Sequence, residues 1–460
     1  MITASEQLGA YLDSFSKVEE RAREGKPRWL HELRQGAFAR FCQAGFPTTH
    51  QEDWRFTNVS ALARTPFELA PGERISVEDV EPFRLSGALC QLVFVNGHFQ
   101  KELSLLDRLP TGVRVTSLAR EIDENPEGVR AHFARYLNIE RDPFCALNTA
   151  FAEDGAYVEI RKGTVVEQPI ALLFVSTAAD KPLMSHPRNL IVAGGETQAA
   201  ILEDYVSLGE TTAFSNTATE LVAGENAVIS HYMIVREHGQ AFNISTLRLE
   251  QGRSANVASH SVLLGGGLVR NNVHPVLAGE GGECLINGLF IGSGREHLDN
   301  YMLVEHRSAH SASRQFYNGI LDGRAHGVFH GRIIVHKNAQ KTDAKQTNRN
   351  LLLSDDARID TKPQLEIYAD DVKCTHGATI GQIEENALFY LRSRGIDELS
   401  ARKLLLLAFA GECVDRMAAG VAREHVERLI HAYLIELALS PKLETSAGGE
   451  EQGRVWEETR

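Results

Sequence analysis

The residues with the clearest chemical potential are Cys374 and His376, near the end of a strand-rich stretch that runs from His330 to Thr379. Side chains alternate between the two faces of an extended strand, so a cysteine and a histidine two residues apart point the same way. A thiolate and an imidazole on one face can bind iron or another soft or borderline metal. A single C-x-H pattern is, however, more often a small buried cysteine beside a hydrogen-bonded histidine.

Further histidines gather in the same part of the chain, at positions 297, 306, 310, 326, 330 and 336. His306 and His310, like His326 and His330, are four residues apart, which would keep each pair on one face of a strand. Such pairs can be metal ligands, although solvated or hydrogen-bonded histidines are the commoner explanation. A local basic zone overlaps this region, and its simplest interpretation is a solvated face: Lys337, Lys341, Lys345, Arg349 and Arg358.

Composition limits the classes of function that fit. The chain has 460 residues, 43% hydrophobic and 24% charged, which is ordinary for a soluble globular protein of two to four domains. A net charge of −13 argues against a nucleic-acid surface and against docking on anionic membrane. Six scattered cysteines without a CxxC pair indicate reduced thiols. With neither a signal peptide nor a membrane-spanning run in view, we expect a cytoplasmic protein.

The middle of the chain contains an internal repeat. Short strands follow one another with glycine turns at Gly194, Gly224, Gly252 and Gly279, which are 30, 28 and 27 residues apart. Weaker continuations fall at Ser308 and Asn338. One turn and two or three short strands per repeat favour a β-helix-like solenoid over a four-stranded propeller blade, while an ordinary β-sandwich is the alternative. A solenoid has open ends that need caps, and its last coil leaves an edge available for pairing.

The remaining patterns divide the chain into five parts: helical residues 1–87, a small mixed α/β segment 88–165, a mainly β solenoid core 166–385, a helical region 386–440 and a mobile tail 441–460. Trp54 and Phe56 should pack the first helices onto the rest of the protein. The last helix carries an apolar stripe that suits either core packing or partner docking. There is no GxxxxGK[ST], HExxH or GxSxG motif, so no nucleotide-hydrolysing P-loop is expected.

Four segments resemble the SufD family, which belongs to the SufBCD iron–sulfur cluster assembly scaffold. They are GFPTTHQEDWRFT, ALNTAFAEDG, the stretch from His330 to Thr379, and YLRSRGIDELSARKLLLLAFA. The stretch ending in Cys374, Thr375 and His376 is the most specific of them. The resemblance covers essentially the whole chain apart from the tail.

This resemblance implies a right-handed parallel β-helix and a scaffold rather than an enzyme. It implies that the β-helix edge pairs with a SufB-like subunit, or with a second copy as a homodimer, and that the C-terminal helices bind a SufC-like ABC-type ATPase. A transient iron–sulfur cluster would form at the SufB–SufD interface, with His376 as candidate ligand and Cys374 as a weaker one. Whether a flavin also belongs to the complex is left open by the resemblance. The competing hypotheses are a β-helix enzyme acting on polysaccharide and a stand-alone histidine-rich metal-binding protein.

Overall fold

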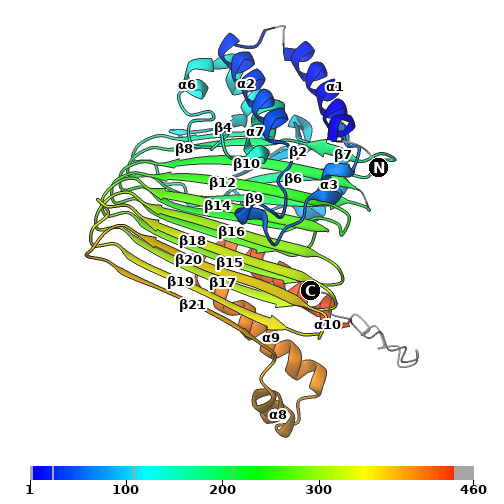
Figure 1. Ribbon diagram of the computed structural model, residues 1–460, viewed down its shortest axis with the longest axis vertical. Coiled ribbons are helices and arrows are strands. Elements are labelled where there is room, and N and C mark those ends of the chain that lie inside the picture. The colour runs from blue at the N-terminus through cyan, green and yellow to red at the C-terminus, as the bar shows by residue number, and fades with distance from the viewer. Residues whose placement is uncertain (1–3, 23–24, 107–108, 211, 440–460) are drawn as a thin grey trace, which may run out of the picture.

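The computed structural model describes residues 4–22, 25–106, 109–210 and 212–439, so the predicted tail 441–460 lies outside the described residues. Its centre is a stack of coils, each of which gives one strand to each of two sheets (Figure 1). Even-numbered strands from β8 to β20 form sheet A, and odd-numbered strands from β9 to β21 form sheet B. All of these strands pair in parallel, and the stack makes about seven turns. The predicted parallel β-solenoid is therefore confirmed.

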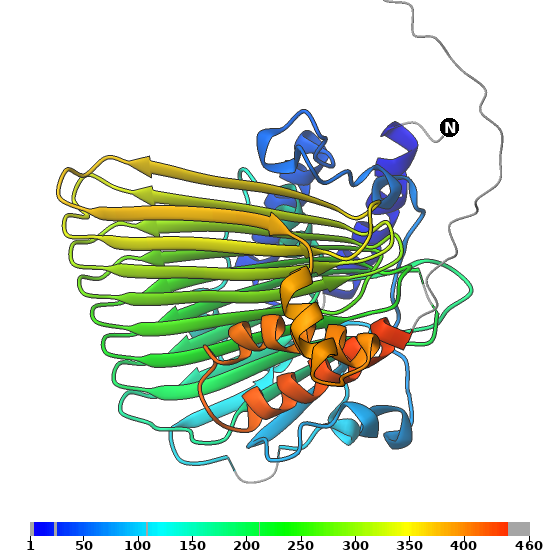
Figure 2. The same ribbon diagram turned by 90° about the horizontal axis from the view of Figure 1, so that it is seen from below.

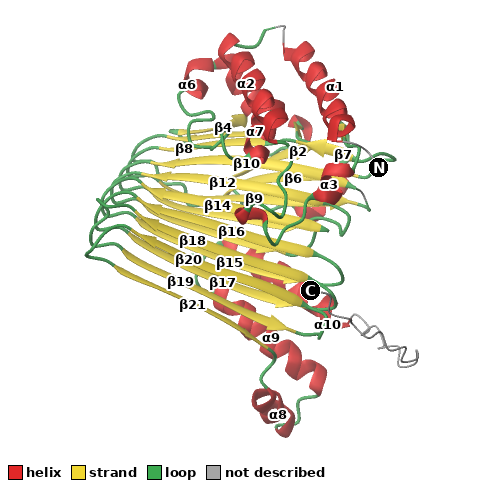
Figure 3. Ribbon diagram, viewed as in Figure 1, coloured by secondary structure: helices red, strands yellow, loops and turns green. Residues whose placement is uncertain are grey.

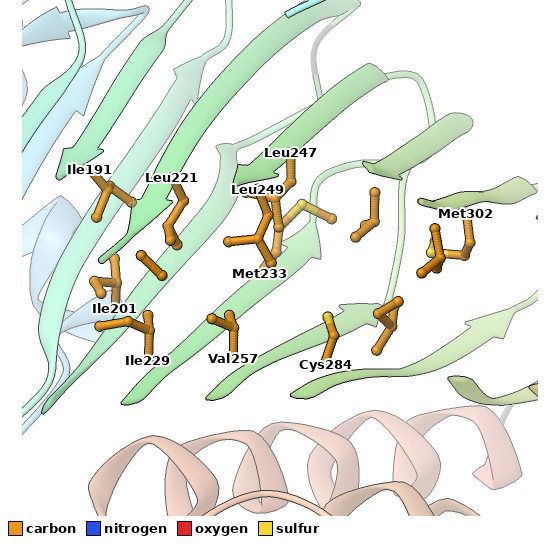
Figure 4. Packing of buried hydrophobic residues seen from close by; sticks show 14 of the residues in the cluster. Ile191, Ile201, Leu221, Ile229, Met233, Leu247, Leu249, Val257, Cys284 and Met302 are labelled. Atoms are coloured by element: carbon orange, nitrogen blue, oxygen red, sulfur yellow. The ribbon is translucent and has the colours of Figure 1, made fainter. Parts of the chain in front are cut away.

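The strands of the stack, in chain order, are β8 Arg188–Ala193, β9 Gln198–Leu208, β10 Ala213–Ala223, β11 Val228–Arg236, β12 Phe242–Gln251, β13 Asn256–Leu263, β14 Leu268–Leu277, β15 Glu283–Gly292, β16 His297–His306, β17 Ala312–Leu321, β18 His326–Val335, β19 Asp343–Leu352, β20 Arg358–Ile367 and β21 Lys373–Gly381. Side chains that point inward from the two sheets form one apolar core, which Figure 4 shows as rows of aliphatic and sulfur-containing residues. Burial of these rows supplies the main driving force for coil stacking.

The glycine turns repeat because successive coils touch there. The amide of Gly224 donates to Ala193 O at 2.8 Å, and the amide of Gly252 donates to Ala223 O at 2.8 Å. Two positions after each of the four predicted turn glycines comes a residue with positive φ, at Glu196, Asn226, Ser254 and Gly281, and the two weaker repeats are followed by His310 and Lys341. The predicted repeat is thus the turn that precedes the sheet B strands β9 to β19.

The N-terminal part closes the first coils. Sheet A ends in the antiparallel pair β5–β4, and sheet B ends in the hairpin β2–β3. Asn96 and Gly97 form the predicted hairpin turn, with φ of 53° and 83°. The elements are α1 Ala4–Ala22, α2 Arg28–Ala44, η1 Glu52–Trp54, α3 Ser60–Arg64, β1 Glu68–Leu69, α4 Val77–Val80, η2 Glu81–Phe83, β2 Cys90–Val95, β3 His98–Phe99, η3 Lys101–Leu103, β4 Val113–Ser117, α5 Leu118–Glu124, α6 Pro126–Arg130, α7 Pro143–Phe151, β5 Ala156–Ile160, β6 Ile170–Thr177 and β7 Leu183–Ser185.

The C-terminal helices are α8 Glu385–Ser393, α9 Glu398–Val414 and α10 Val421–Leu439. The predicted N-cap Asp397 accepts a hydrogen bond from the amide of Ser400 at 2.9 Å. Helices α9 and α10 lie along the outer face of sheet B (Figure 2), where Val426, Ile430 and Leu434 join its apolar residues. The stripe of the last helix therefore serves packing. Figure 3 shows most helices gathered around the first coils and along this one face, with α8 projecting beyond the last coil. None of the described helices is long and apolar enough to cross a membrane.

The stacked turns predict a sharp penalty for side chains at the glycine positions. A Cβ on Gly224 would lie 2.6 Å from Gly195 N and 2.7 Å from Gly194 C, backbone atoms that cannot move without parting two coils. We expect Gly224→Ala to lower the free energy of unfolding by about 1–3 kcal/mol, measured by urea denaturation. The control is Gly36→Ala in α2, where nothing lies within 4 Å of the new Cβ and stability should rise slightly. Equal stability of wild type and Gly224→Ala would contradict this account.

Candidate functional site

Cys374 and His376 lie on β21, the last strand of sheet B. They are in register with Ala344 and Gln346 of β19, whose side chains are buried inside the solenoid. Both residues therefore project toward the interior side of the last coil, as the two-residue spacing predicts. No further coil covers them within the described ranges, so Cys374 is half-buried against the core and His376 is exposed.

The backbone of β21 is also free on its outer side. The amide of Lys373 donates to Thr342 O at 2.8 Å, which fixes the odd-numbered amides toward β19. In a parallel strand the N–H and C=O groups of alternate residues point to opposite sides. The peptide groups of Cys374 and His376 consequently face away from β19, and no strand in the described part of the chain pairs with them. We call β20 and β21 together the open edge.

The chemistry of the pair is that of an incomplete ligand set. Burial raises the pKa of the Cys374 thiol, a shift that a backbone hydrogen bond from Ala344 partly opposes. Metal binding here has to displace the thiol proton. Among the described residues no group of three or more His, Cys, Asp or Glu side chains is placed to hold a metal ion. Cys374 and His376 therefore supply at most two ligands, and an iron–sulfur cluster held here would need further ligands from another molecule.

Beneath His376 the solenoid interior is polar. Gln346 Nε2 donates to Gln315 Oε1 at 2.8 Å, so the two side-chain amides are stacked on neighbouring coils. His376 occupies the equivalent position on the next coil. Gln346 Oε1 is buried and has no hydrogen-bond partner among the described residues. Gly331 of β18 leaves the space that this side chain fills, because a Cβ there would collide with the amide. Amide groups thus line the interior beneath His376, while the apolar core continues beside them to Ala344 and Cys374.

The other predicted histidine pairs have different outcomes. His306 ends β16 and is buried, with both ring nitrogens 2.8 Å from the hydroxyls of Ser311 and Ser313. His310 lies in the following turn, where φ is 56°. The prediction that these two share a strand face is wrong, because the chain turns between them. His326 and His330 do share the outer face of β18, but they contact Asp360 and Gln364 respectively.

The basic zone is partly neutralised within the chain. Lys341 pairs with Asp371, and Arg349 pairs with Glu412 and lies 5.3 Å from the ring centre of Phe409 in α9. Arg349 thereby helps to hold α9 against sheet B. Lys337, Lys345 and Arg358 are exposed, which agrees with a solvated face.

Helix α8 carries a second unusual surface. It projects beyond the last coil (Figure 1), and the side chains of Phe389 and Tyr390 are 74% and 57% exposed. Leu399 and Leu404 on α9 are also exposed, at 43% and 48%. We call these four residues the α8–α9 patch. Exposed aromatic side chains such as those of Phe389 and Tyr390 are enriched in protein-binding surfaces.

Sequence reasoning missed a site on the outer face of sheet A. The segment that follows α2 crosses this face (Figure 1), with Trp54 buried and its ring centre 3.8 Å from the guanidinium of Arg270. The packing role expected for Trp54 is confirmed. Beside it lies a cavity of about 350 Å³, lined by Phe56, Asn58, Ala61, Gly239, Gln240, Phe242, Gly267, Leu268, His297 and His326. The signal available in the sequence was the 29-residue spacing of His297 and His326, which equals one repeat.

Comparisons with known proteins agree with this architecture. Residues 174–409 match the family model described as "SUF system FeS cluster assembly, SufBD core domain", and residues 5–172 match "SufBD protein N-terminal region". An iron–sulfur cluster assembly SufBD family protein of Synechocystis is 37% identical over 84% of this chain and 87% of its own length. The iron–sulfur cluster assembly protein SufD of Escherichia coli is 31% identical over 82% and 86%. That of Bacillus subtilis is 25% identical over 88% and 93%.

Proposed function

Because the chain belongs to the SufBD family of iron–sulfur cluster assembly proteins, we propose that it acts as a SufD-type, non-catalytic scaffold subunit that completes a cluster site together with a partner. The observation that carries the proposal is the incomplete ligand pair, Cys374 and His376, on an unpaired strand. A soft thiolate and a borderline imidazole suit the iron of a nascent cluster, which is the cargo of such a scaffold. A partner strand at the same edge would bring the missing ligands.

The proposed partner at the open edge is a SufB-like subunit. Free peptide groups on β21 support this choice, because an added strand would continue sheet B by hydrogen bonds. The apolar side chain of Ile380 supports it too, since it is 51% exposed at the same edge. In the absence of the partner, a second copy of this chain would be accepted by the same peptide groups.

The proposed partner at the α8–α9 patch is a SufC-like ABC-type ATPase. The chain contains no GxxxxGK[ST] motif, so energy from nucleotide hydrolysis has to come from another subunit. The patch lies next to the open edge along the chain, because α8 begins four residues after β21 ends. Movement of the ATPase would thus be transmitted directly to the cluster site.

The first prediction concerns the cluster ligand. We expect His376→Ala to lower the iron and sulfide retained by the anaerobically reconstituted complex by about tenfold or more, since even changes beside a metal ligand typically weaken metal binding that much. Iron and sulfide analysis and the visible spectrum of the co-purified complex measure it. His310→Ala, which removes an exposed turn histidine, is the matched control and should leave the cluster unchanged. A normal cluster in an intact His376→Ala complex would place all the ligands on the partner.

The second prediction concerns pairing at the open edge. Ile380→Asp should weaken binding to the SufB-like subunit by at least about tenfold, because an ionised carboxylate would replace apolar surface that pairing buries. Analytical ultracentrifugation gives the affinity. Val228→Asp is the control, since Val228 is 45% exposed at the start of β11, away from the edge. If both variants bind equally well, the partner does not pair at this edge.

The third prediction concerns the ATPase. We expect Phe389→Asp to abolish co-purification of the SufC-like ATPase while the pairing of this chain with the SufB-like subunit persists, because an aromatic anchor of this kind carries much of an interface's binding energy. Pull-down with each partner separately distinguishes the two effects. Val77→Asp, which changes a 50% exposed residue in α4, serves as control. Retention of the ATPase by Phe389→Asp would exclude the α8–α9 patch as its docking site.

A further inference from the structure

His297 and His326 approach each other across two neighbouring coils. They are the first residues of β16 and β18, they are in register, and both point outward from sheet A into the cavity beside Phe56. Their ring centres are 4.7 Å apart with an angle of 77° between the ring planes. The positions before them in the same column are Phe242 and Leu268, so the cavity has an apolar half and an imidazole half.

The hydrogen bonds of His297 determine which of its nitrogens carries the proton. Asp299 pairs with the guanidinium of Arg270, and as a carboxylate it can only accept hydrogen bonds. The hydroxyl of Thr57 therefore donates its one proton to Asp299 Oδ2, at 2.5 Å. Nε2 of His297 lies 2.9 Å from the same hydroxyl and must be the donor in that contact. The proton thus resides on Nε2, and Nδ1 keeps its lone pair.

His326 is arranged in the same way. Its Nε2 lies 2.7 Å from Asp360 Oδ2, so the N–H group of that nitrogen donates to the carboxylate. Nδ1 of His326, like Nδ1 of His297, has no hydrogen bond to any described residue. A histidine that donates one ring N–H to a carboxylate, directly or through one group, presents a fixed and more basic second nitrogen, which is the usual arrangement of metal-bound histidines.

We propose that His297 and His326 bind one divalent first-row transition metal ion through their Nδ1 atoms, in a site on the outer face of sheet A that is separate from the open edge. Two imidazoles on one ion, with metal–nitrogen distances of about 2.1 Å and bond angles of about 90–110°, have ring centres roughly 4.6–5.3 Å apart. The ring centres of His297 and His326 are 4.7 Å apart, within reach of one shared ion. Water or a small exogenous ligand in the cavity would occupy the remaining positions.

The chemistry of the cavity selects the class of ion. Neutral imidazole nitrogens suit iron, cobalt, nickel, copper and zinc, whereas magnesium and calcium prefer a shell of oxygen atoms. Asp360 stands behind the ring of His326 and contributes negative charge without occupying a coordination position, whereas the charge of Asp299 is balanced by Arg270. The apolar residues Phe56, Phe242 and Leu268 restrict water on the opposite side, which strengthens the attraction between the ion and its ligands.

The test uses the full-length chain carrying Cys374→Ser and His376→Ala, so that the open edge does not contribute. Co²⁺ is titrated into this metal-free protein and followed by calorimetry and by visible absorption. We expect one Co²⁺ per chain. His297→Gln or His326→Gln should each weaken binding by at least about 100-fold, and Asp360→Asn, which keeps both ligands, by about 10–100-fold.

His336→Gln is the matched control, because His336 is an exposed histidine that contacts Glu305 and lies outside the cavity. It should bind Co²⁺ as the parent does. Circular dichroism verifies that each variant is folded. Because Asp360 is partly exposed, its replacement should leave the sheet folded, so Asp360→Asn gives a decisive measurement even if replacement of His297 disturbs the sheet. The proposal is overturned if the parent binds no Co²⁺, if His326→Gln and Asp360→Asn bind as tightly as the parent, or if His336→Gln loses binding equally. None of these results depends on the cluster site at the open edge.

Discussion

The parallel backbone ladder between successive coils is the constraint on which the rest of the molecule depends. Each inner strand is hydrogen-bonded on both sides, and each position stacks on the one that lies one repeat earlier. Residues far apart in sequence thereby form columns. One column contains the turn glycines, a second leads through Gln315 and Gln346 to His376, and a third joins His297 to His326. The neighbours of a residue are consequently set by its place in the repeat.

The same ladder leaves the last coil unfinished, and its two strands differ in what they present. On β20 the amide of Arg358 donates to a residue that flanks β18, and the amide of Tyr368, just beyond β20, donates to β18 itself. The even-numbered peptide groups therefore face β18, and the odd-numbered ones face outward. Pro363 occupies one of these outward positions, where the missing N–H costs no bond within the chain and discourages unspecific pairing. On β21 the outward-facing peptide groups, which include those of Cys374 and His376, all keep their N–H donors. The open edge therefore restricts pairing on one sheet and permits it on the other.

Much of this arrangement could be predicted from the sequence. The glycine spacing indicated the solenoid, and the period of two placed Cys374 and His376 on one face, because both follow from local geometry. The pairing of His306 with His310 failed because a turn with positive φ at His310 separates them. The contact of His297 with His326 was missed because the i, i+4 spacing within a strand was considered and the repeat length was not. Nothing local indicates that the segment around Trp54 covers the outer face of sheet A, since that contact depends on side chains from three coils.

The two metal-binding surfaces proposed for this chain differ in when they can act. At the open edge the Cys374 thiol has a raised pKa, so a metal has to displace a proton from a half-buried group and finds only one imidazole beside it among the described residues. That cost is offset only when a second chain adds ligands and covers the edge, which ties cluster binding to assembly of the complex. The imidazoles of His297 and His326 are oriented by Thr57 and Asp360 within the chain itself. They need no partner strand, so the two proposals together assign a metal site to the free subunit and a cluster site to the assembled complex.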